Sequence, residues 1–174
     1  PWDGENALYK ALPFIQSVAS IQPRKKIVFD VDFFDVINVT ESKSESGRTS
    51  IPGQWTCNIN YRYAPGPSMQ EAEIEFSNLL ASTGFEKLEV TILDHVPSAQ
   101  VIETELLNDF LSRLGRQVEA KQAWTDVAQL NGIGIPAFNF GPGLTQQAHK
   151  TNEYICLRDV ADYYGVLHEL IKNY

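Results

Sequence analysis

The order of hydrophobic patterns along the first 96 residues limits the folds open to this chain. Apolar residues recur at helical or at alternating spacing in the order helix, strand, strand, helix, strand, over residues 5–21, 27–40, 54–64, 68–84 and 87–96. This order is that of a split βαβ unit without its first strand. We therefore expect residues 1–96 to form a two-layer α+β unit whose missing strand lies outside these residues.

The pattern changes after Pro97. Helical spacing predicts three helices, over residues 99–115, 122–132 and 157–174. One short apolar run, residues 135–141, predicts a buried strand. Helices that alternate with a continuously apolar strand are typical of α/β folds. Residues 97–174 are too few to build a full parallel sheet, so we expect them to complete a sheet supplied elsewhere.

Charge and cysteine content exclude some classes of protein. The formal net charge is −8, and 14 Lys and Arg residues offer no basic stripe for nucleic acid. No apolar run approaches the ~20 residues that cross a bilayer, so no membrane partner is expected either. Cys57 and Cys156 lie in a predicted strand and at the flank of another segment. Buried, reduced thiols of a cytoplasmic protein fit this pattern.

His149 is the histidine with the most informative position. It follows the predicted strand 135–141 and the glycines of a Gly-Pro-Gly corner, Gly141 and Gly143. The carboxyl ends of strands in an α/β sheet form ligand crevices, and glycine lets the backbone approach a bound group. A lone histidine in a loop is more often a solvated side chain than a metal ligand, and spacing alone does not decide between the two interpretations. We interpret His95 and His168 as structural or solvent-facing.

Five ordered motifs give the chain a resemblance to a known family: PWDGENALYKA, NINYRYAPGPS, WTDVA, IPAFNFGPG and AHKTNE. They resemble the actinobacterial-type succinyl-diaminopimelate desuccinylases, within the zinc aminoacylase and carboxypeptidase superfamily. The resemblance implies a two-layer, ferredoxin-like lid (dimerisation) unit over residues 1–96. It implies that residues 97–174 are the C-terminal part of a zinc-peptidase-like α/β catalytic domain. Only the C-terminal half of such an enzyme is covered.

The resemblance also implies roles for particular residues. His149 would be one ligand of a dizinc centre, in which zinc activates the water that attacks an amide. Arg62 would grip a substrate carboxylate, Thr125 would lie in a substrate loop, and the backbone at Gly141 and Gly143 would bind substrate. The other zinc ligands and the general base lie outside the chain. We therefore expect no catalytic residue in these 174 residues and no activity from them alone.

Less specific interpretations remain open for the same residues. Without the resemblance, Arg62 is an outward-facing strand residue. Thr125 with Asp126 can form a helix cap, a role that is compatible with substrate binding. The chain reads GRTSIPG where the family has an asparagine that contacts substrate, so its substrate can differ.

The expected complete enzyme hydrolyses N-succinyl-LL-2,6-diaminopimelate to succinate and LL-diaminopimelate in lysine biosynthesis. A related N-acyl-amino-acid deacylase or carboxypeptidase, or a non-catalytic dimerisation module, are the alternatives. We expect a cytoplasmic homodimer joined through residues 1–95, with the predicted strand 27–40 available at the edge of the sheet.

Overall fold

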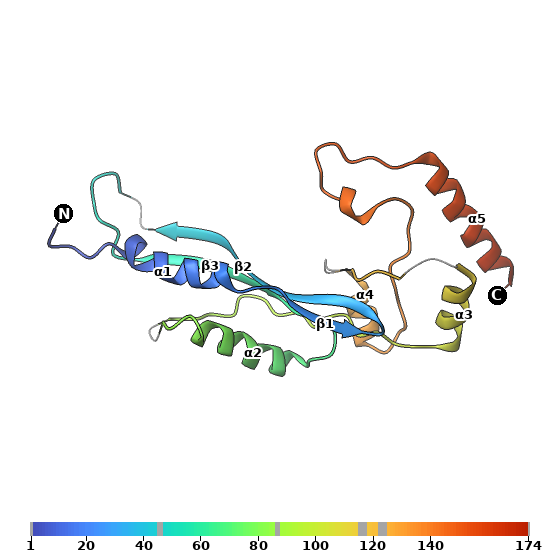
Figure 1. The fold of residues 1–174 in the computed structure, drawn as a ribbon, viewed down its shortest axis with the longest axis horizontal. Coiled ribbons are helices and arrows are strands. Elements are labelled where there is room, and N and C mark those ends of the chain that lie inside the picture. The colour runs from blue at the N-terminus through green and yellow to red at the C-terminus, as the bar shows by residue number, and fades with distance from the viewer. Residues whose placement is uncertain (1, 45–46, 86–87, 115–117, 122–124, 174) are drawn as a thin grey trace.

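The computed structural model describes residues 2–44, 47–85, 88–114, 118–121 and 125–173. Within them the chain is a mixed α/β protein with a three-stranded antiparallel sheet, in the order β1-β2-β3, and five α-helices (Figure 1). The elements are α1 Ala7–Ser20, β1 Arg24–Val28, β2 Val31–Ser44, β3 Trp55–Arg62, α2 Met69–Ala81, α3 Glu105–Leu114, α4 Val127–Gly132, the short 3-10 turn η1 Thr145–Gln147 and α5 Leu157–Asn173. The predicted positions 87, 115, 122–124 and 174 lie outside the described residues.

The core of the sheet lies on one face, against α1 and α2. Phe14 and Val18 from α1, Ile37 from β2 and Leu80 from α2 form the buried cluster. The odd-numbered residues of β3 pack against it, since alternate residues of a strand point to the same face. Full burial of each such side chain contributes roughly 1.5–3 kcal/mol, so this face holds the two helices to the sheet.

A hairpin replaces the start of the single strand predicted over residues 27–40. β1 pairs with β2 through a two-residue turn at Phe29 and Asp30, whose φ angles are 51° and 59°. A turn with both φ values positive matches the twist of the strands it joins. The prediction was wrong because such turns are usually marked by Asn-Gly or Asp-Gly, whereas the residues of this turn are Phe29 and Asp30.

The helix predicted over residues 68–84 is confirmed as α2. The Ser68 hydroxyl accepts a hydrogen bond from the Glu71 backbone, and the Glu71 carboxylate accepts one from the Ser68 backbone. This reciprocal pair satisfies two backbone donors that a helix start otherwise leaves open. Gly84, at φ 79°, takes the left-handed conformation that commonly ends a helix.

Neither of the other two predicted strands, 87–96 and 135–141, forms a strand within the described residues. Residues 88–96 and 135–140 are irregular, and no sheet pairing includes them. A strand is defined by its neighbour, because its backbone N–H and C=O groups pair with those of another strand. The prediction of strand was wrong for this chain as it stands, although the alternation of apolar residues is present.

A second apolar cluster forms among residues that follow Pro97. The ring of Phe110 in α3 contacts the rings of Phe138 and Phe140, and Phe140 contacts Tyr163 in α5. Asn131 joins neighbouring segments, because its side-chain amide donates to the carbonyls of Gln100 and Ala137 and accepts from the Ala137 N–H.

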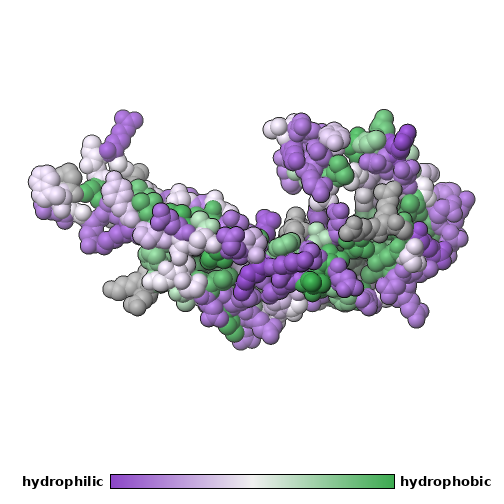
Figure 2. All heavy atoms as spheres, viewed as in Figure 1, coloured by the Kyte–Doolittle hydropathy of each residue, from purple (hydrophilic) through white to green (hydrophobic). Residues whose placement is uncertain are grey.

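Apolar side chains remain exposed over α3 and α5, as Figure 2 shows among the polar residues of that part of the molecule. α5 contains no buried residue. None of the described helices combines the length and apolar character needed to cross a membrane.

Candidate functional site

Arg62 lies at the end of β3, on the sheet face opposite to the helices. It pairs with Val36 of β2, and the residues on either side of it, Tyr61 and Tyr63, point to the other face. The Nε of Arg62 donates to Oδ1 of Asn60, two residues earlier on the same face, at 3.0 Å. This bond occupies one edge of the guanidinium, so the two terminal nitrogens remain available for a bidentate partner.

Arg62 differs from the other cations of the sheet in its surroundings. The other strand cations, Arg24, Lys25, Lys26 and Lys43, each lie within 4 Å of a carboxylate. Among the residues that the structure describes, Arg62 has no carboxylate within ion-pair distance and its one hydrogen bond goes to an amide. An arginine held in place but not neutralised can bind a carboxylate from outside the chain.

The half-buried strand pattern of residues 27–40 predicts that Asp30, Asp32 and Asp35 face water. In the structure, Asp35 instead holds the buried carboxylate of the sheet. Its side chain is only 1% exposed and lies 3.1 Å from Nζ of Lys26 and 3.5 Å from Nη2 of Arg24. The expectation was wrong for Asp35, because its neighbours on β1 supply two positive charges that compensate for its burial.

Two further residues extend this charged cluster on the helix side of the sheet. Glu75 from α2 accepts from Arg24 at 2.6 Å and from the hydroxyl of Tyr61 at 3.1 Å. Burial opposes ionisation of Glu75, but the hydrogen bond from Tyr61 and the charges of Lys26 and Arg24 outweigh it and lower its pKa. Burial, then the charges of Asp35 and Glu75, raise the pKa of Tyr61 well above its usual range. The cluster uses every one of its charges internally, which indicates a structural role.

Thr125 lies two residues before the start of α4, and its side chain contacts a residue that the sequence analysis did not single out. Its hydroxyl accepts a hydrogen bond from Nδ2 of Asn139 at 3.2 Å. The side chain of Asp126 makes no capping hydrogen bond to α4. Thr125 therefore connects the start of α4 to residues 135–140, and helix capping by these two side chains is not observed.

Gly141 and Gly143 line a small hollow between the Gly-Pro-Gly corner and α5. Its volume is about 170 Å³, and Phe140, Asp159, Tyr163 and Val166 are among the other residues that line it. Gly143 has a φ of 90°, which a residue with a side chain rarely adopts. The corner thus depends on glycine for its backbone conformation at position 143.

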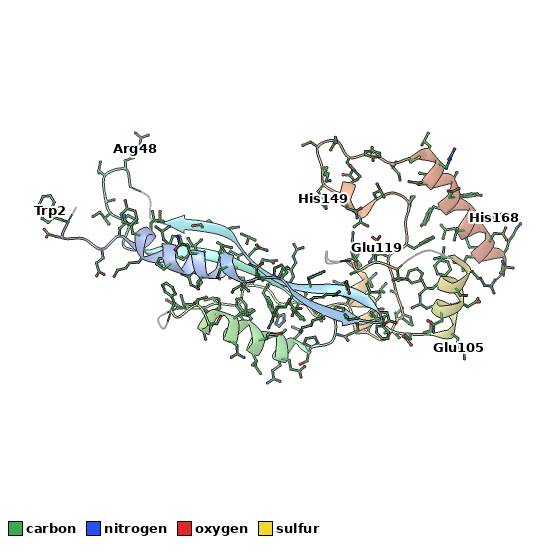
Figure 3. The ribbon with its side chains drawn as sticks, viewed as in Figure 1. Trp2, Arg48, Glu105, Glu119, His149 and His168 are labelled. Atoms are coloured by element: carbon green, nitrogen blue, oxygen red, sulfur yellow. The ribbon has the colours of Figure 1, made fainter. Side chains whose placement is uncertain are left out.

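His149 lies in the exposed loop that leads into α5 (Figure 3). Its φ is 64°, in the left-handed region, and its backbone N–H donates to Oε2 of Glu153 at 3.2 Å. Left-handed backbone at a residue other than glycine is uncommon and recurs at functional sites. Glu153 therefore holds the backbone at His149, and the residue remains exposed.

The described residues do not by themselves form a metal centre. Nowhere in the part of the chain that the structure describes do three His, Cys, Asp or Glu side chains gather closely enough to hold an ion. One imidazole and no bridging carboxylate do not fit a dinuclear zinc site, which needs several protein ligands. His149 can supply one ligand and no more.

The structure brings the predicted site residues into contact with neighbours but not with one another. No hydrogen bond or ion pair between described residues joins Arg62, Thr125 and His149. Sequence reasoning missed Asn60 and Asn139, the two amides that contact the first two of these. The spacing of Asn60 and Arg62, two residues apart in a predicted strand, was the available signal for the first of them.

The other histidines and the cysteines have ordinary surroundings. His95 lies between Tyr63 and Glu73, and His168 stacks on Tyr164. Cys57 is half-buried and Cys156 is exposed, so the expectation of a buried thiol was wrong for Cys156.

Comparison with known proteins decides the family. The model of peptidase family M20/M25/M40 matches residues 13–173, nearly the whole chain. The chain belongs to peptidase family M20/M25/M40. This confirms the resemblance drawn from the five motifs and identifies the chain as part of a hydrolase family.

Two relatives extend the comparison. A succinyl-diaminopimelate desuccinylase of Corynebacterium glutamicum is 27% identical over 174 residues, which are 99% of this chain and 47% of that protein. A Mycobacterium tuberculosis relative, also named for succinyl-diaminopimelate desuccinylase, is 27% identical over 157 residues, or 88% of this chain and 43% of that protein. This M20 chain thus spans a little under half the length of these relatives.

Proposed function

We propose that this M20 chain is the C-terminal half of a dizinc amidohydrolase that converts N-succinyl-LL-2,6-diaminopimelate to succinate and LL-diaminopimelate, in lysine biosynthesis. The names of the relatives support this substrate, and the family supports hydrolysis. The chain alone is proposed to be inactive, because it supplies one candidate zinc ligand and no general base.

Arg62 carries the proposal on the structural side. A substrate with free carboxylates needs a cation that the protein has not already neutralised. Arg62 is such a cation, and its bond to Asn60 leaves the two terminal nitrogens in the fork geometry that matches a carboxylate. Thr125, with Asn139, and the backbone at Gly141 and Gly143 are proposed as further substrate contacts.

His149 is proposed as the zinc ligand of this half. Its exposed imidazole and its fixed backbone support this role. When bound, zinc would supply an activated water and polarise the amide. The remaining ligands would come from the other half of the enzyme.

We further propose that residues 1–96 form a ferredoxin-like lid and dimerisation unit, and that residues 97–174 belong to the catalytic domain of a cytoplasmic homodimer. The core around Phe14, Ile37 and Leu80 supports an independently packed first unit. The aromatic cluster around Phe110 supports a second one.

An amine-release assay of the complete enzyme with N-succinyl-LL-diaminopimelate tests the function. We expect zinc-dependent release of LL-diaminopimelate, and none from the 174-residue chain alone. If the complete enzyme hydrolyses another N-acyl amino acid or a peptide instead, the related deacylase or carboxypeptidase is the correct function. If the complete protein is folded and binds zinc but hydrolyses none of these substrates, the proposal is overturned. The non-catalytic dimerisation module is then the interpretation that remains.

A further inference from the structure

Asn60 and Arg62 form a pair on the sheet face opposite to the helices. Both belong to β3 and lie two positions apart, so their side chains point to the same side of the sheet. The Nε–H of Arg62 donates to Oδ1 of Asn60 at 3.0 Å. On the neighbouring strand Arg62 faces Val36, whose side chain has no hydrogen-bond acceptor. Among the described residues, Asn60 therefore provides the hydrogen bond that holds the Arg62 side chain.

The chemistry of the two groups determines which way the Asn60 amide points. A guanidinium has donors only, so the atom that faces Nε must be the carbonyl oxygen of the amide. The NH2 group of Asn60 then lies on the other side of the amide, and it donates to no other described residue. The pair thus offers donors alone, from the two terminal nitrogens of Arg62 and from Nδ2 of Asn60. Such a group matches a ligand that only accepts, as a carboxylate does.

Two other cations on this face of the sheet are held differently. Nζ of Lys25 lies 2.6 Å from a carboxylate oxygen of Asp32, and Nζ of Lys43 lies 2.8 Å from one of Glu41. Each of these lysines is matched by one negative charge. A carboxylate at position 60 would match Arg62 in the same way. The amide found there accepts the same hydrogen bond without adding a negative charge.

We propose that Asn60 is a positioning residue for substrate binding, which orients Arg62 through Nε while leaving its positive charge to a carboxylate of the substrate. This inference rests on the proposed function, in which the substrate carries free carboxylates. Alanine at this position would leave the charge but lose the orientation. Aspartate would keep the orientation but neutralise the charge. The neutral amide provides both effects together.

Steady-state kinetics of the complete enzyme with N-succinyl-LL-diaminopimelate separates the two effects. Asn60→Ala should raise KM roughly three- to ten-fold, the value of one hydrogen bond. Asn60→Asp should raise KM further, because its carboxylate competes with that of the substrate for Arg62. The kcat of both variants should stay within about two-fold of the parent, since the contact binds substrate and transition state alike. Asn60→Gln, which keeps an amide, should recover most of the parent KM.

Asn58 provides the matched control, because it is an asparagine on the same strand and the same face. Its Nδ2 donates to Oγ1 of Thr40 at 2.7 Å, and it has no hydrogen bond to Arg62. Asn58→Ala and Asn58→Asp make the same changes of size and charge two residues further from Arg62. We expect each of them to change KM by less than about two-fold, as is usual for surface substitutions. Equal effects on KM at positions 58 and 60 would overturn the proposal.

Nitrogen-15 NMR of the 174-residue chain tests the same contact without catalysis. The Nε–H signal of Arg62 is assigned by its absence from the spectrum of Arg62→Lys. Exchange of this proton with water should be slow in the parent and in Asn60→Asp, and faster in Asn60→Ala. Succinate, a small dicarboxylate, should shift the signal in the parent and in Asn58→Asp but not in Asn60→Asp.

The two experiments distinguish a failure of this inference from a failure of the proposed function. If Arg62→Lys raises KM but the Asn60 variants match the parent, the inference is overturned and the function stands. If the complete enzyme does not hydrolyse the substrate, the proposed function fails, and the NMR results decide whether Asn60 holds Arg62 for a carboxylate. Equal exchange in the parent and Asn60→Ala, or no succinate shift in the parent, would overturn the inference.

Discussion

The carboxylate of Asp35 in β2 accepts a hydrogen bond of 2.7 Å from the backbone N–H of Ala64, just beyond the end of β3. The same carboxylate lies between Lys26 and Arg24 of β1. One buried side chain thus joins all three strands at the end of the sheet where Arg62 lies.

Asp35→Ala should destabilise the chain by about 3 kcal/mol, because it removes a buried carboxylate that two cations share with Glu75 and leaves the buried backbone N–H of Ala64 without its partner. Urea unfolding followed by circular dichroism measures the change. The control is Asp32→Ala, whose exposed ion pair with Lys25 is expected to be worth less than about 1 kcal/mol. Similar losses in the two variants would show that Asp35 acts as an ordinary surface carboxylate.

Asn131→Asp should destabilise the chain more than Asn131→Ala. The amide of Asn131 donates to the carbonyls of Gln100 and Ala137, and a carboxylate would place a negative oxygen against them. We expect a loss of roughly 2–3 kcal/mol for alanine, from unsatisfied buried groups, and a larger loss for aspartate. Thermal unfolding of both variants at neutral pH compares them, and the opposite order would contradict the proposed hydrogen-bond directions.

The stability of the chain should depend on Glu75 at acid pH. Its pKa is lowered in the folded chain, so its contribution is complete above the unfolded value of 4.5 and is lost as the pH falls through the lower folded value. Urea midpoints measured between about pH 6 and pH 3 should therefore fall less steeply in Glu75→Gln than in the parent. The control is the same substitution at an exposed position, Glu103→Gln. If the urea midpoint falls with pH equally steeply in the parent and both variants, the prediction is contradicted.

Arg62→Lys in the complete enzyme should raise KM for N-succinyl-LL-diaminopimelate about ten- to a hundred-fold, because a point charge replaces a fork that holds two oxygens and a charged hydrogen bond is worth roughly 1.5–3 kcal/mol. Steady-state kinetics with substrate varied over a wide range provides the measurement. Arg158→Lys, at the exposed start of α5, should leave KM unchanged. Equal KM values for the two variants would mean that Arg62 is an ordinary surface residue of β3 and does not bind the substrate.

His149→Ala should remove one of the two zinc ions that we propose for the complete enzyme, and with it most of the turnover. Metal analysis of dialysed protein measures the first effect, and the amine-release assay measures the second. His168→Ala, a histidine that stacks on Tyr164 in α5, should keep both zinc ions. Unchanged metal content in His149→Ala would mean that this residue is a surface side chain of its loop.

Local patterns were enough to predict α1, α2 and α5, whereas the helix predicted from residue 99 begins only at Glu105. α2 has its serine cap and its terminal glycine in the sequence, and α5 has an unbroken amphipathic repeat. The Phe29–Asp30 turn was missed because its residues are not those that usually mark such turns. The segments 88–96 and 135–140 were assigned as strands because alternation reports which side chains are apolar, whereas a strand also requires a neighbour to pair with.

The sequence predicted candidate site residues only where the residue type itself can bind a carboxylate or a metal. Arg62 and His149 could be singled out through their motifs, and their fixed geometry then came from Asn60 and Glu153. The burial of Asp35 depends on two cations in another strand, and the contacts of Asn131 join segments far apart in the sequence. Such pairings follow from the tertiary arrangement, which the spacing along the chain does not encode.

α5 is a helix of 17 residues, none of which is buried, and this determines where local unfolding of the chain begins. An isolated helix of that length is only marginally stable in water, and tertiary packing normally supplies the rest. Its ordering therefore rests mainly on the contact between Tyr163 and Phe140 and on its own backbone. Local opening should begin here, so that a protease of broad specificity trims the C-terminal helix well before it cuts α1, whose buried Phe14 and Val18 tie it to the sheet.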